Sequence, residues 1–387
     1  MIKLNKDNWK REPFSFVADC VERHDKNPIE NGLTKFIGLD NIDSSSLSIN
    51  NTGEIENGTT FSKTFQSGDV LFGKRRPYLR KVAIANFSGI CSGDILVFRA
   101  REKNILCDLL PLYVSSEGFI QYAISTSAGS LSPRTKWRDL AKYEISLPPF
   151  EEQKQIVDLF KSIETTIKQV GEQEKHLKKF WKKLIDEFVS DVPRFGSLLK
   201  DKSLKNVNYC DVTEKLMRRI DPLTYGIERI VAGENLESED FKIRTWQKVG
   251  EGYLGPAFHV LFKAGDILYG SRRTYLRKVS FADFDGVCAN TTYVIKANES
   301  ILLQGLLKHI MLSERFTQYS IGVSKGSTNP YINWKDLDNF SFQIPDTKTQ
   351  KEIVKVLDDI FEIVEQLKQQ KTTLNNLKQK LLNEILN

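Results

Sequence analysis

Two long stretches of the chain carry apolar residues at a regular alternation of three and four positions. In the first stretch nine of ten such positions are apolar, namely Ile156, Phe160, Ile163, Ile167, Val170, Leu177, Trp181, Leu184 and Phe188. In the second stretch eight of ten are apolar, namely Ile353, Leu357, Ile360, Val364, Leu367, Leu374, Leu381 and Ile385. This heptad spacing predicts a coiled-coil helix in each stretch. A helix of about 38 residues would be about 57 Å long.

The two helices could pack on each other, or each could pack on its own globular domain. A strict heptad seam is narrower than the apolar face that a domain surface needs, which favours pairing of the helices. If a pseudo-twofold axis relates the two halves of the chain, the helices are antiparallel. Glu174 and Lys371, two charged exceptions to the heptads, would then meet near the centre of the seam and could set its register. Unchanged stability after the two charges are exchanged would argue against that contact.

The segment before each helix has the pattern of a mixed globular domain. In the first copy, residues 69–72, 81–85 and 94–98 are short apolar or alternating runs typical of strands, and residues 105–124 have the pattern of a helical stretch. Pro148 and Pro149, which come directly before the first heptad stretch, suit the start of a helix.

These patterns predict an α+β fold, in which two globular domains are separated by an antiparallel coiled coil. The predicted domains cover residues 1–149 and 191–345, and the predicted helical regions cover residues 150–190 and 346–387.

The chain also contains an internal sequence repeat, whose two copies are offset by 197 residues. Eleven of the fifteen residues from Gly68 to Val82 recur from Gly265 to Val279. The offset continues without a gap through Cys91/Cys288, Phe119/Phe316, Tyr122/Tyr319, Gly129/Gly326, Trp137/Trp334, Pro148/Pro345, Gln153/Gln350, Ile156/Ile353 and Leu184/Leu381. Two similar but unequal copies predict a bipartite ligand with two related half-sites.

Composition narrows the class of protein. The hydrophobic fraction of 40% supports folded cores, and no apolar run is long enough to span a bilayer. Five cysteines without CxxC spacing argue against a zinc site or a disulfide framework and favour the cytoplasm. The net charge of +6 is mild, but five of the eight residues from Lys74 to Lys81 are basic. Such local clusters suit a polyanion bound at defined places.

No catalytic motif is complete. Leu147-Pro148-Pro149-Phe150 resembles the motif of amino-methyltransferases, but Leu147 cannot accept a hydrogen bond from an amino group. Residues 322–328 contain the letters of a P-loop in the wrong order, and residues 152–154 match only three letters of a nuclease motif. Four dispersed histidines show no metal-ligand spacing. We therefore predict no catalytic residue and no metal site on this chain.

The positive signal is a basic and aromatic loop that occurs in both copies. Its side chains could neutralise phosphates, and arginine can also read guanine through paired hydrogen bonds. The predicted DNA-binding residues of the first copy are Lys74, Arg75, Arg76, Tyr78, Arg80 and Lys81, with Arg134 and Lys136 from a second polar loop. Those of the second copy are Ser271, Arg272, Arg273, Tyr275, Arg277, Lys278, Asn290, Tyr331 and Asn333. A solvated basic surface is the alternative, and recurrence of the pattern favours DNA.

These residues carry a family resemblance. The stretch Gly68 to Arg76, with Arg80-Lys81-Val82-Ala83 and Cys91 to Asp94, resembles a target recognition domain of Type I restriction–modification specificity subunits. The stretch Gly270 to Thr292 resembles another form of that domain. Pro148 to Ile156 resembles the start of the helical region of that family.

The resemblance implies a non-catalytic DNA-reading subunit of a Type I restriction–modification complex. Each target recognition domain would bind one half of a split, asymmetric double-stranded DNA site, and the helices would measure the spacer. The implied partners are two modification subunits, which use S-adenosylmethionine to methylate adenine at N6, and restriction subunits, which use ATP and Mg²⁺ to translocate and cleave DNA.

Positions that differ between the copies are candidates for reading unlike half-sites. They are Lys74/Ser271, Pro77/Thr274, Ser92/Ala289, Gly93/Asn290, Asp94/Thr291, Arg134/Tyr331 and Lys136/Asn333. By side-chain chemistry, Asn290 and Asn333 suit adenine and Lys74 suits guanine. An exchange of residues 74 and 271 that left half-site preference unchanged would remove the assignment of Lys74.

Other functions stay open. The chain could be the specificity subunit of a fused, Type IIB-like restriction and methylation enzyme, which the sequence does not distinguish. It could also be a coiled-coil protein that bridges two protein-binding domains, in which case no salt-dependent DNA binding is expected. A self-sufficient methyltransferase would need a cofactor motif and a polar residue in place of Leu147.

Overall fold

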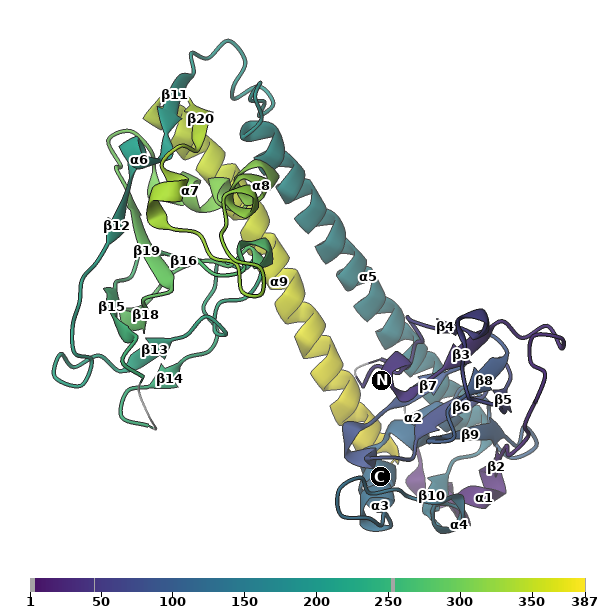
Figure 1. The fold of residues 1–387 in the computed structure, drawn as a ribbon. Coiled ribbons are helices and arrows are strands. Elements are labelled where there is room, and N and C mark those ends of the chain that lie inside the picture. The colour runs from purple at the N-terminus through teal and green to yellow at the C-terminus, as the bar shows by residue number, and fades with distance from the viewer. Residues whose placement is uncertain (1–3, 45, 252–254, 387) are drawn as a thin grey trace. The chain divides into compact units, whose positions relative to one another are not determined.

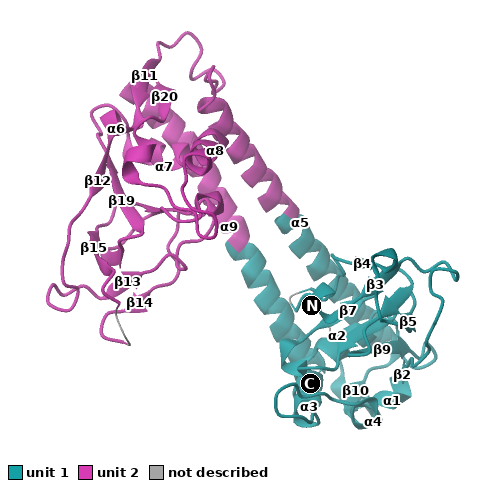
Figure 2. Cartoon of the chain, viewed as in Figure 1, with its two compact units in different colours: residues 1–171, 369–387 teal, residues 172–368 magenta. Residues whose placement is uncertain are grey.

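The computed structural model describes residues 4–44, 46–251 and 255–386, which form two compact units (Figure 1 and Figure 2). Unit 1 comprises residues 1–171 and 369–387, and unit 2 comprises residues 172–368. Two long helices, α5 (Phe150–Phe188) and α9 (Thr347–Leu386), each contribute a segment to both units. Both long helices and the α+β class are therefore confirmed.

Unit 1 contains two four-stranded sheets and one strand pair. The first sheet is antiparallel, in the order β2 (Ala18–Cys20), β9 (Ile95–Ala100), β6 (Val70–Gly73) and β7 (Val82–Ile84). The second has the order β4 (Gly53–Glu54), β3 (Lys35–Ile37), β8 (Gly89–Cys91) and β5 (Lys63–Phe65), with β3 and β8 parallel. The antiparallel pair is β1 (Lys10–Pro13) with β10 (Glu144–Leu147). Strands β6, β7 and β9 confirm the three strand predictions.

The short helices of unit 1 are α1 (Phe14–Val17), α2 (Leu110–Ser115), α3 (Glu117–Ser125) and α4 (Trp137–Leu140). The helical stretch predicted over residues 105–124 is thus two helices that begin later. The break falls at Ser116, whose backbone is extended at ψ 152° and whose hydroxyl accepts a hydrogen bond from the Phe119 amide at 3.3 Å. Serine favours this N-cap role because its side chain satisfies an amide that the helix leaves free.

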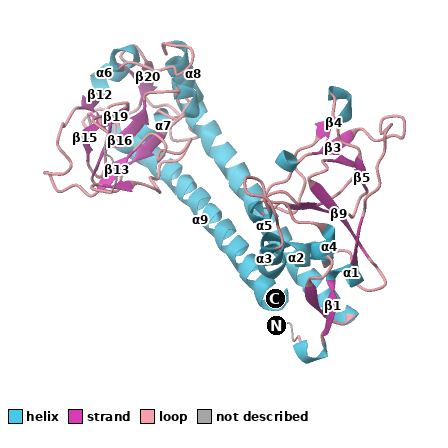
Figure 3. Ribbon diagram, turned by 60° about the horizontal axis from the view of Figure 1, so that its bottom comes forward, coloured by secondary structure: helices cyan, strands magenta, loops and turns pink. Residues whose placement is uncertain are grey.

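Unit 2 repeats this architecture. One sheet has the order β12 (Thr213–Leu216), β19 (Thr292–Ala297), β16 (Ile267–Gly270) and β17 (Val279–Phe281). The other has the order β14 (Gln247–Lys248), β13 (Arg229–Val231), β18 (Gly286–Ala289) and β15 (Phe258–Phe262), with β13 and β18 parallel. The strand pair is β11 (Lys205–Asn208) with β20 (Ser341–Ile344), and the short helices are α6 (Tyr209–Val212), α7 (Gln304–Ile310) and α8 (Glu314–Gly322). Figure 3 shows these strands and short helices beside the long-helix segments of each unit.

In each unit the long helices pack on each other and also on the globular core. The core of unit 1 joins Phe14, Phe98 and Phe119 to Phe160 of α5 and Leu382 of α9, all of them at most 2% exposed. The two packing modes considered for the heptad residues are therefore combined, because the apolar seam of each helix segment continues into the core of its unit.

The pairing is antiparallel in the part of each unit that the structure describes. In unit 1, Lys378 of α9 forms an ion pair with Glu164 of α5, and Gly171 of α5 lies opposite Lys371. Residue numbers thus rise on one helix as they fall on the other. Lys378 is one of the charged exceptions in the heptads, and Glu164 neutralises it there. The predicted contact between Glu174 and Lys371 joins residues of different units and stays a prediction.

In unit 2 the corresponding place on the helix pair is aromatic. Trp181 of α5 packs against Phe361 of α9 with ring centroids 5.8 Å apart, and Phe241 and His309 complete the cluster. His309 is 1% exposed, and its Nε2 lies 2.8 Å from Asp358 Oδ1. Lys308 forms an ion pair with that carboxylate at 2.8 Å. Burial lowers the pKa of His309 to about 4.

This buried histidine predicts that unit 2 loses stability in mild acid. The unfolded chain binds the proton near pH 6.5, and the folded chain resists it down to about pH 4, so stability falls as the pH drops through that window. The expected loss between pH 7.5 and pH 5 is about 2 kcal/mol. The variant His309→Leu, which carries the residue that unit 1 has at the equivalent position 112, should lack this component. Urea unfolding of both proteins at the two pH values measures it, and identical pH dependence would contradict the assignment to His309.

Among the described residues, no helix is both long and apolar enough to cross a membrane.

Candidate nucleic-acid interface

The basic loop of each unit folds into a turn with unusual backbone geometry. In unit 1 a short 3-10 turn, η4 (Pro77–Leu79), lies between Arg76 and Arg80, both at φ 53°. In unit 2 the turn η5 (Thr274–Leu276) lies between Arg273 and Arg277, both at φ 51°. A left-handed backbone costs a residue with a side chain roughly 1–2 kcal/mol. The same costly geometry at four arginines indicates that surrounding contacts impose it.

Those contacts come from the second predicted loop. The Arg76 amide donates to the Pro133 carbonyl at 2.7 Å, and the Thr135 amide donates to the Lys74 carbonyl at 3.0 Å. In unit 2 the Arg273 amide donates to the Pro330 carbonyl at 2.6 Å in the same way. The structure thus brings together the two loops that the sequence analysis selected, in both units.

A third loop joins each cluster. In unit 1 the Lys74 amide donates to the Asp94 carbonyl at 3.0 Å, and in unit 2 the Ser271 amide donates to the Thr291 carbonyl at 3.0 Å. Residues 92–94 and 289–291, which differ between the copies, therefore lie beside the basic turns. We call each set of three loops the loop cluster of its unit.

In the loop cluster of unit 1, the Asp94 carboxylate binds two arginine side chains. Arg134 Nε lies 2.9 Å from Asp94 Oδ1, and Arg75 Nη1 lies 3.6 Å from Asp94 Oδ2. Arg75 Nε also donates to Ser132 Oγ at 2.6 Å. The hydrogen bond from Arg134 is the main reason that the pKa of Asp94 is lowered. The carboxylate therefore stays ionised at neutral pH and fixes both guanidinium groups.

Other side chains of this cluster are available to a ligand. Tyr78 is 49% exposed, and with the described residues the Arg76 side chain makes only a long hydrogen bond, 3.4 Å, to the Leu131 carbonyl. Lys74, Tyr78 and Lys136 form no side-chain hydrogen bond or ion pair with any residue of the described ranges. These groups can bind a polyanion without first breaking an internal contact.

The unit 2 cluster is more neutral. Tyr275 is 51% exposed, Tyr331 is 44% exposed, and Arg272 and Asn290 also lie at the surface. Arg273 Nε donates to Asn329 Oδ1 at 3.1 Å. The exposed groups here are two guanidinium groups, two phenols and an amide, and of the two guanidinium groups only that of Arg272 forms no side-chain hydrogen bond or ion pair with a described residue.

Two of the predicted DNA-binding residues of unit 2 form side-chain hydrogen bonds within the unit. Ser271 is 5% exposed, and its hydroxyl donates to the Thr291 carbonyl at 2.6 Å. Asn333 Nδ2 donates to Asp336 Oδ2 at 3.0 Å at the start of the turn η6 (Trp334–Leu337). One of the two amide hydrogens of Asn333 is therefore committed to an internal hydrogen bond.

Four further predicted cations bind within their own unit. Lys81 Nζ donates to the Leu39 carbonyl and Lys278 Nζ to the Gly233 carbonyl, each at 2.6 Å. Arg80 and Arg277 bind the carboxylates Glu117 and Glu314 at 2.7 Å and 2.6 Å. These acids and the structural role of Asp94 were not predicted from the sequence. Glu117 and Glu314 are an identical pair at the 197-residue offset, and that signal was present.

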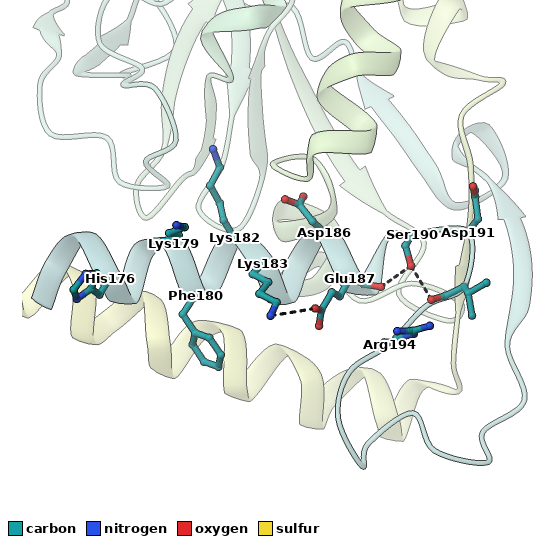
Figure 4. A pocket seen from close by; sticks show the side chains of 11 residues that line it. His176, Lys179, Phe180, Lys182, Lys183, Asp186, Glu187, Ser190, Asp191 and Arg194 are labelled. Atoms are coloured by element: carbon teal, nitrogen blue, oxygen red, sulfur yellow. Dashed lines mark hydrogen bonds and ion pairs between the residues drawn. The ribbon is translucent and has the colours of Figure 1, made fainter.

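A hollow in unit 2 is lined by residues of the C-terminal part of α5 and of the segment after it. It measures about 950 Å³, and its lining combines the exposed apolar residues Phe180 and Val192 with charged side chains (Figure 4). Lys183 pairs there with Glu187 at 3.7 Å. The described residues also contain no cluster of three or more His, Cys, Asp or Glu side chains that could hold a metal ion.

Several curated proteins are similar in sequence. The Type I restriction enzyme EcoDI specificity subunit of Escherichia coli is 30% identical over 171 residues, 43% of this chain and 38% of that protein. The MjaVIII specificity subunit of Methanocaldococcus jannaschii is 24% identical over 320 residues, 77% of this chain and 73% of that protein. The matches thus span between about two fifths and three quarters of these relatives.

Two solved structures share the fold. A chain from a structure described as the basis of complex assembly and conformational transition of the type I R-M system aligns with a TM-score of 0.60 at 20% identity, covering 99% of this chain and 98% of that one. The Type-I restriction-modification system S subunit from M. genitalium aligns with a TM-score of 0.55 at 13% identity, covering 100% and 98%.

The family described as Type I restriction modification DNA specificity domain matches residues 24–179 and 223–376. The two matches fall on the two copies found in the sequence, and each contains one loop cluster. The chain therefore belongs to the Type I restriction modification DNA specificity family and carries its domain twice.

Proposed function

We propose that this chain is the DNA-reading subunit of a Type I restriction–modification complex, and that each loop cluster reads one half of a split DNA site. Family membership supports the class of ligand. One observation carries the assignment to the loops: the same turn, with two left-handed arginines and a half-exposed tyrosine, occurs in both units. A duplicated surface of this kind fits a duplicated ligand.

The chemistry of the turn suits duplex DNA. Arg76 and Arg273 can neutralise backbone phosphates, which fix the position of a protein on DNA without reading its sequence. The tyrosine rings and the neighbouring polar side chains can reach base edges, which carry the sequence. Each loop cluster thus combines both kinds of contact.

The two clusters differ in a way that favours unlike half-sites. Arg134, held at Asp94, presents a fixed guanidinium fork, the group that pairs best with guanine. Unit 2 has Tyr331 and Thr291 at these positions and adds Asn290, whose amide suits adenine. The half-site of unit 1 is therefore expected to contain guanine, and that of unit 2 to contain adenine.

The variant Lys74→Ser should weaken the half-site of unit 1 selectively. Lys74 forms no side-chain hydrogen bond or ion pair with a described residue, so the expected loss, about tenfold, comes mainly from its DNA contact. The reciprocal change at position 271 is less informative, because Ser271 is buried and a lysine there would bury its charge. Lys103→Ser, an exposed lysine beyond the far end of β9, is the control. Affinities for duplexes with either half scrambled measure the effect, and equal losses for both halves would contradict it.

The chemistry of the complex is assigned to partner subunits. On this proposal two modification subunits bring S-adenosylmethionine and methylate adenine at N6, and restriction subunits bring ATP and Mg²⁺ for translocation and cleavage. The long helices, which run from one domain copy into the next, would set the spacer between the half-sites. Family membership supports the DNA-specificity role that this proposal gives to the chain.

Salt titration tests whether the ligand is DNA. The affinity of the full chain for a duplex is expected to fall linearly in a log–log plot against salt, by about one unit of slope for each phosphate contact. Removing Arg76 and Arg273 should make the slope shallower by about two. Affinity that does not depend on salt, or no binding at low salt, would favour a bridging protein instead.

A further inference from the structure

Arg80 and Arg277 were predicted to contact DNA, yet both are occupied elsewhere. In unit 1, Arg80 Nη1 lies 2.7 Å from Glu117 Oε2, and Nη2 donates to Glu117 Oε1 at 2.8 Å. Two parallel bonds of this kind make the strongest and most directional ion pair in proteins. The Arg80 guanidinium therefore points at α3 and away from the exposed side of the turn.

Glu117 is itself fixed on three sides. It is the first residue of α3, and Gln121, one turn later, donates to its Oε1 at 2.7 Å. Its backbone amide donates to Asn383 Oδ1, on the long helix α9 of the same unit, at 3.1 Å. The hydrogen bond from Arg80 is the main reason that the pKa of Glu117 falls to about 2, so the carboxylate is charged at neutral pH.

Unit 2 repeats each link. Arg277 Nη1 lies 2.6 Å from Glu314 Oε2, and Gln318 donates to Glu314 Oε1 at 2.7 Å. The backbone amide of Glu314, the first residue of α8, donates to Asp186 Oδ1 on α5 at 2.7 Å. Asp186 is visible on α5 in Figure 4. All four residues stand at the 197-residue offset from their counterparts, and only Asn383/Asp186 differs in type.

Unit 2 adds further contacts to the same arginine. Arg277 Nε lies 3.1 Å from Glu239 Oε1, and Glu239 also pairs with Lys182 of α5 at 2.6 Å. Arg277 donates to the Leu312 carbonyl as well. Its side chain is 11% exposed, compared with 41% for Arg80. The guanidinium groups of both arginines are occupied by internal contacts and are not available to a phosphate, and Arg277 is the more buried of the two.

We propose that Arg80 and Arg277 are positioning residues, each of which holds the tyrosine-bearing turn of its unit against a short helix that is bonded to the long-helix segment of the same unit. The inference rests on the proposed function and adds how the position of the base contacts is determined. The turn that contacts the bases keeps a fixed position relative to the long helix that measures the spacer. Asn383 in unit 1 and Asp186 in unit 2 are the points at which the long helix enters this chain of contacts.

The alternative, that Arg80 leaves Glu117 to bind a phosphate, predicts effects of opposite sign. In that case Glu117→Gln removes a competing negative charge and frees a cation, so DNA binding strengthens. On our proposal the same change loosens the turn, so discrimination at the unit 1 half-site falls by about tenfold. The salt slope stays unchanged on our proposal, because no phosphate contact is lost.

The experiment uses the full chain assembled with its modification subunits. Long-read sequencing of methylated genomic DNA first gives the split motif of the wild-type chain. Affinities are then measured for duplexes with the intact motif and with each half scrambled, for Glu117→Gln and for Glu314→Gln. Glu117→Gln should relax one half by about tenfold and leave the other within about twofold, and Glu314→Gln should do the reverse.

A variant in which the charges of Arg80 and Glu117 are exchanged distinguishes the positioning role from simple misfolding. Arg80→Glu alone should lose discrimination at the same half, and Arg80→Glu combined with Glu117→Arg should restore it to within about threefold. A phosphate contact cannot be restored in this way, because a glutamate would then face the DNA. Restored stability without restored discrimination would therefore overturn the inference, as would stronger binding by Glu117→Gln.

The two proposals fail in different ways. A wild-type chain that directs no split methylated motif overturns the proposed function, and with it the assignment of the turns to DNA. A clear split motif whose two halves are read equally well by wild type, Glu117→Gln and Glu314→Gln overturns only the positioning role.

Discussion

Replacing Arg76 and Tyr78 together by alanine is expected to weaken recognition of one half of the DNA target about a hundredfold and to leave the other half within about twofold. Both side chains lie on the exposed side of the unit 1 turn, where Tyr78 is 49% exposed and Arg76 has only one long internal hydrogen bond. Their loss therefore costs contacts to DNA and little folding stability.

The mirror variant, Arg273→Ala with Tyr275→Ala, is the matched control. It should weaken the opposite half by a similar factor, because the turn of unit 2 has the same geometry. Affinities for duplexes with one half scrambled measure both effects. If either double variant weakened binding to both halves equally, the two turns would not each recognise a separate half-site.

Replacing Trp181 by alanine is expected to destabilise unit 2 by about 4 kcal/mol. Trp181 is 2% exposed and packs against Phe241 and Phe361, so its removal leaves a large cavity between the long helices and the core. The neighbouring residue Phe180 is 51% exposed and lies outside the heptad seam. Phe180→Ala should therefore change the stability of unit 2 by no more than about 0.5 kcal/mol.

Urea unfolding followed by fluorescence at a fixed pH measures this pair of variants. The contrast tests the heptad assignment directly, because the two residues are adjacent in sequence and both are large aromatics. Similar losses of stability in both variants would mean that the seam does not run through position 181.

Patterns that repeat along the chain were enough to predict the architecture. The long helices follow from heptads, since seam residues such as Ile156, Phe160 and Trp181 are buried against the core of their unit. The strands β6, β7 and β9 follow from short apolar runs. The break between α2 and α3 did not, because Ser116 ends one helix and caps the next within an apolar stretch whose periodicity continues across it.

The sequence was enough to predict which segments form the loop clusters, but not how the side chains in them are arranged. Recurrence at one offset identified the turns and the second loops, and both lie together in each unit. The inward bonding of Arg80, Lys81 and their counterparts depends on acceptors far away in sequence, such as Glu117, 37 residues later. A run of basic residues shows only charge, and the fold decides which cations remain free.

The central claim, that one chain reads two half-sites, is tested most directly by mapping DNA methylation with long-read sequencing. Cells would carry the modification subunit with this chain, or the modification subunit alone. The account predicts a split motif with N6-methyladenine in both halves when the chain is present, and no such motif without it. The same methylated motifs in both cultures would contradict it.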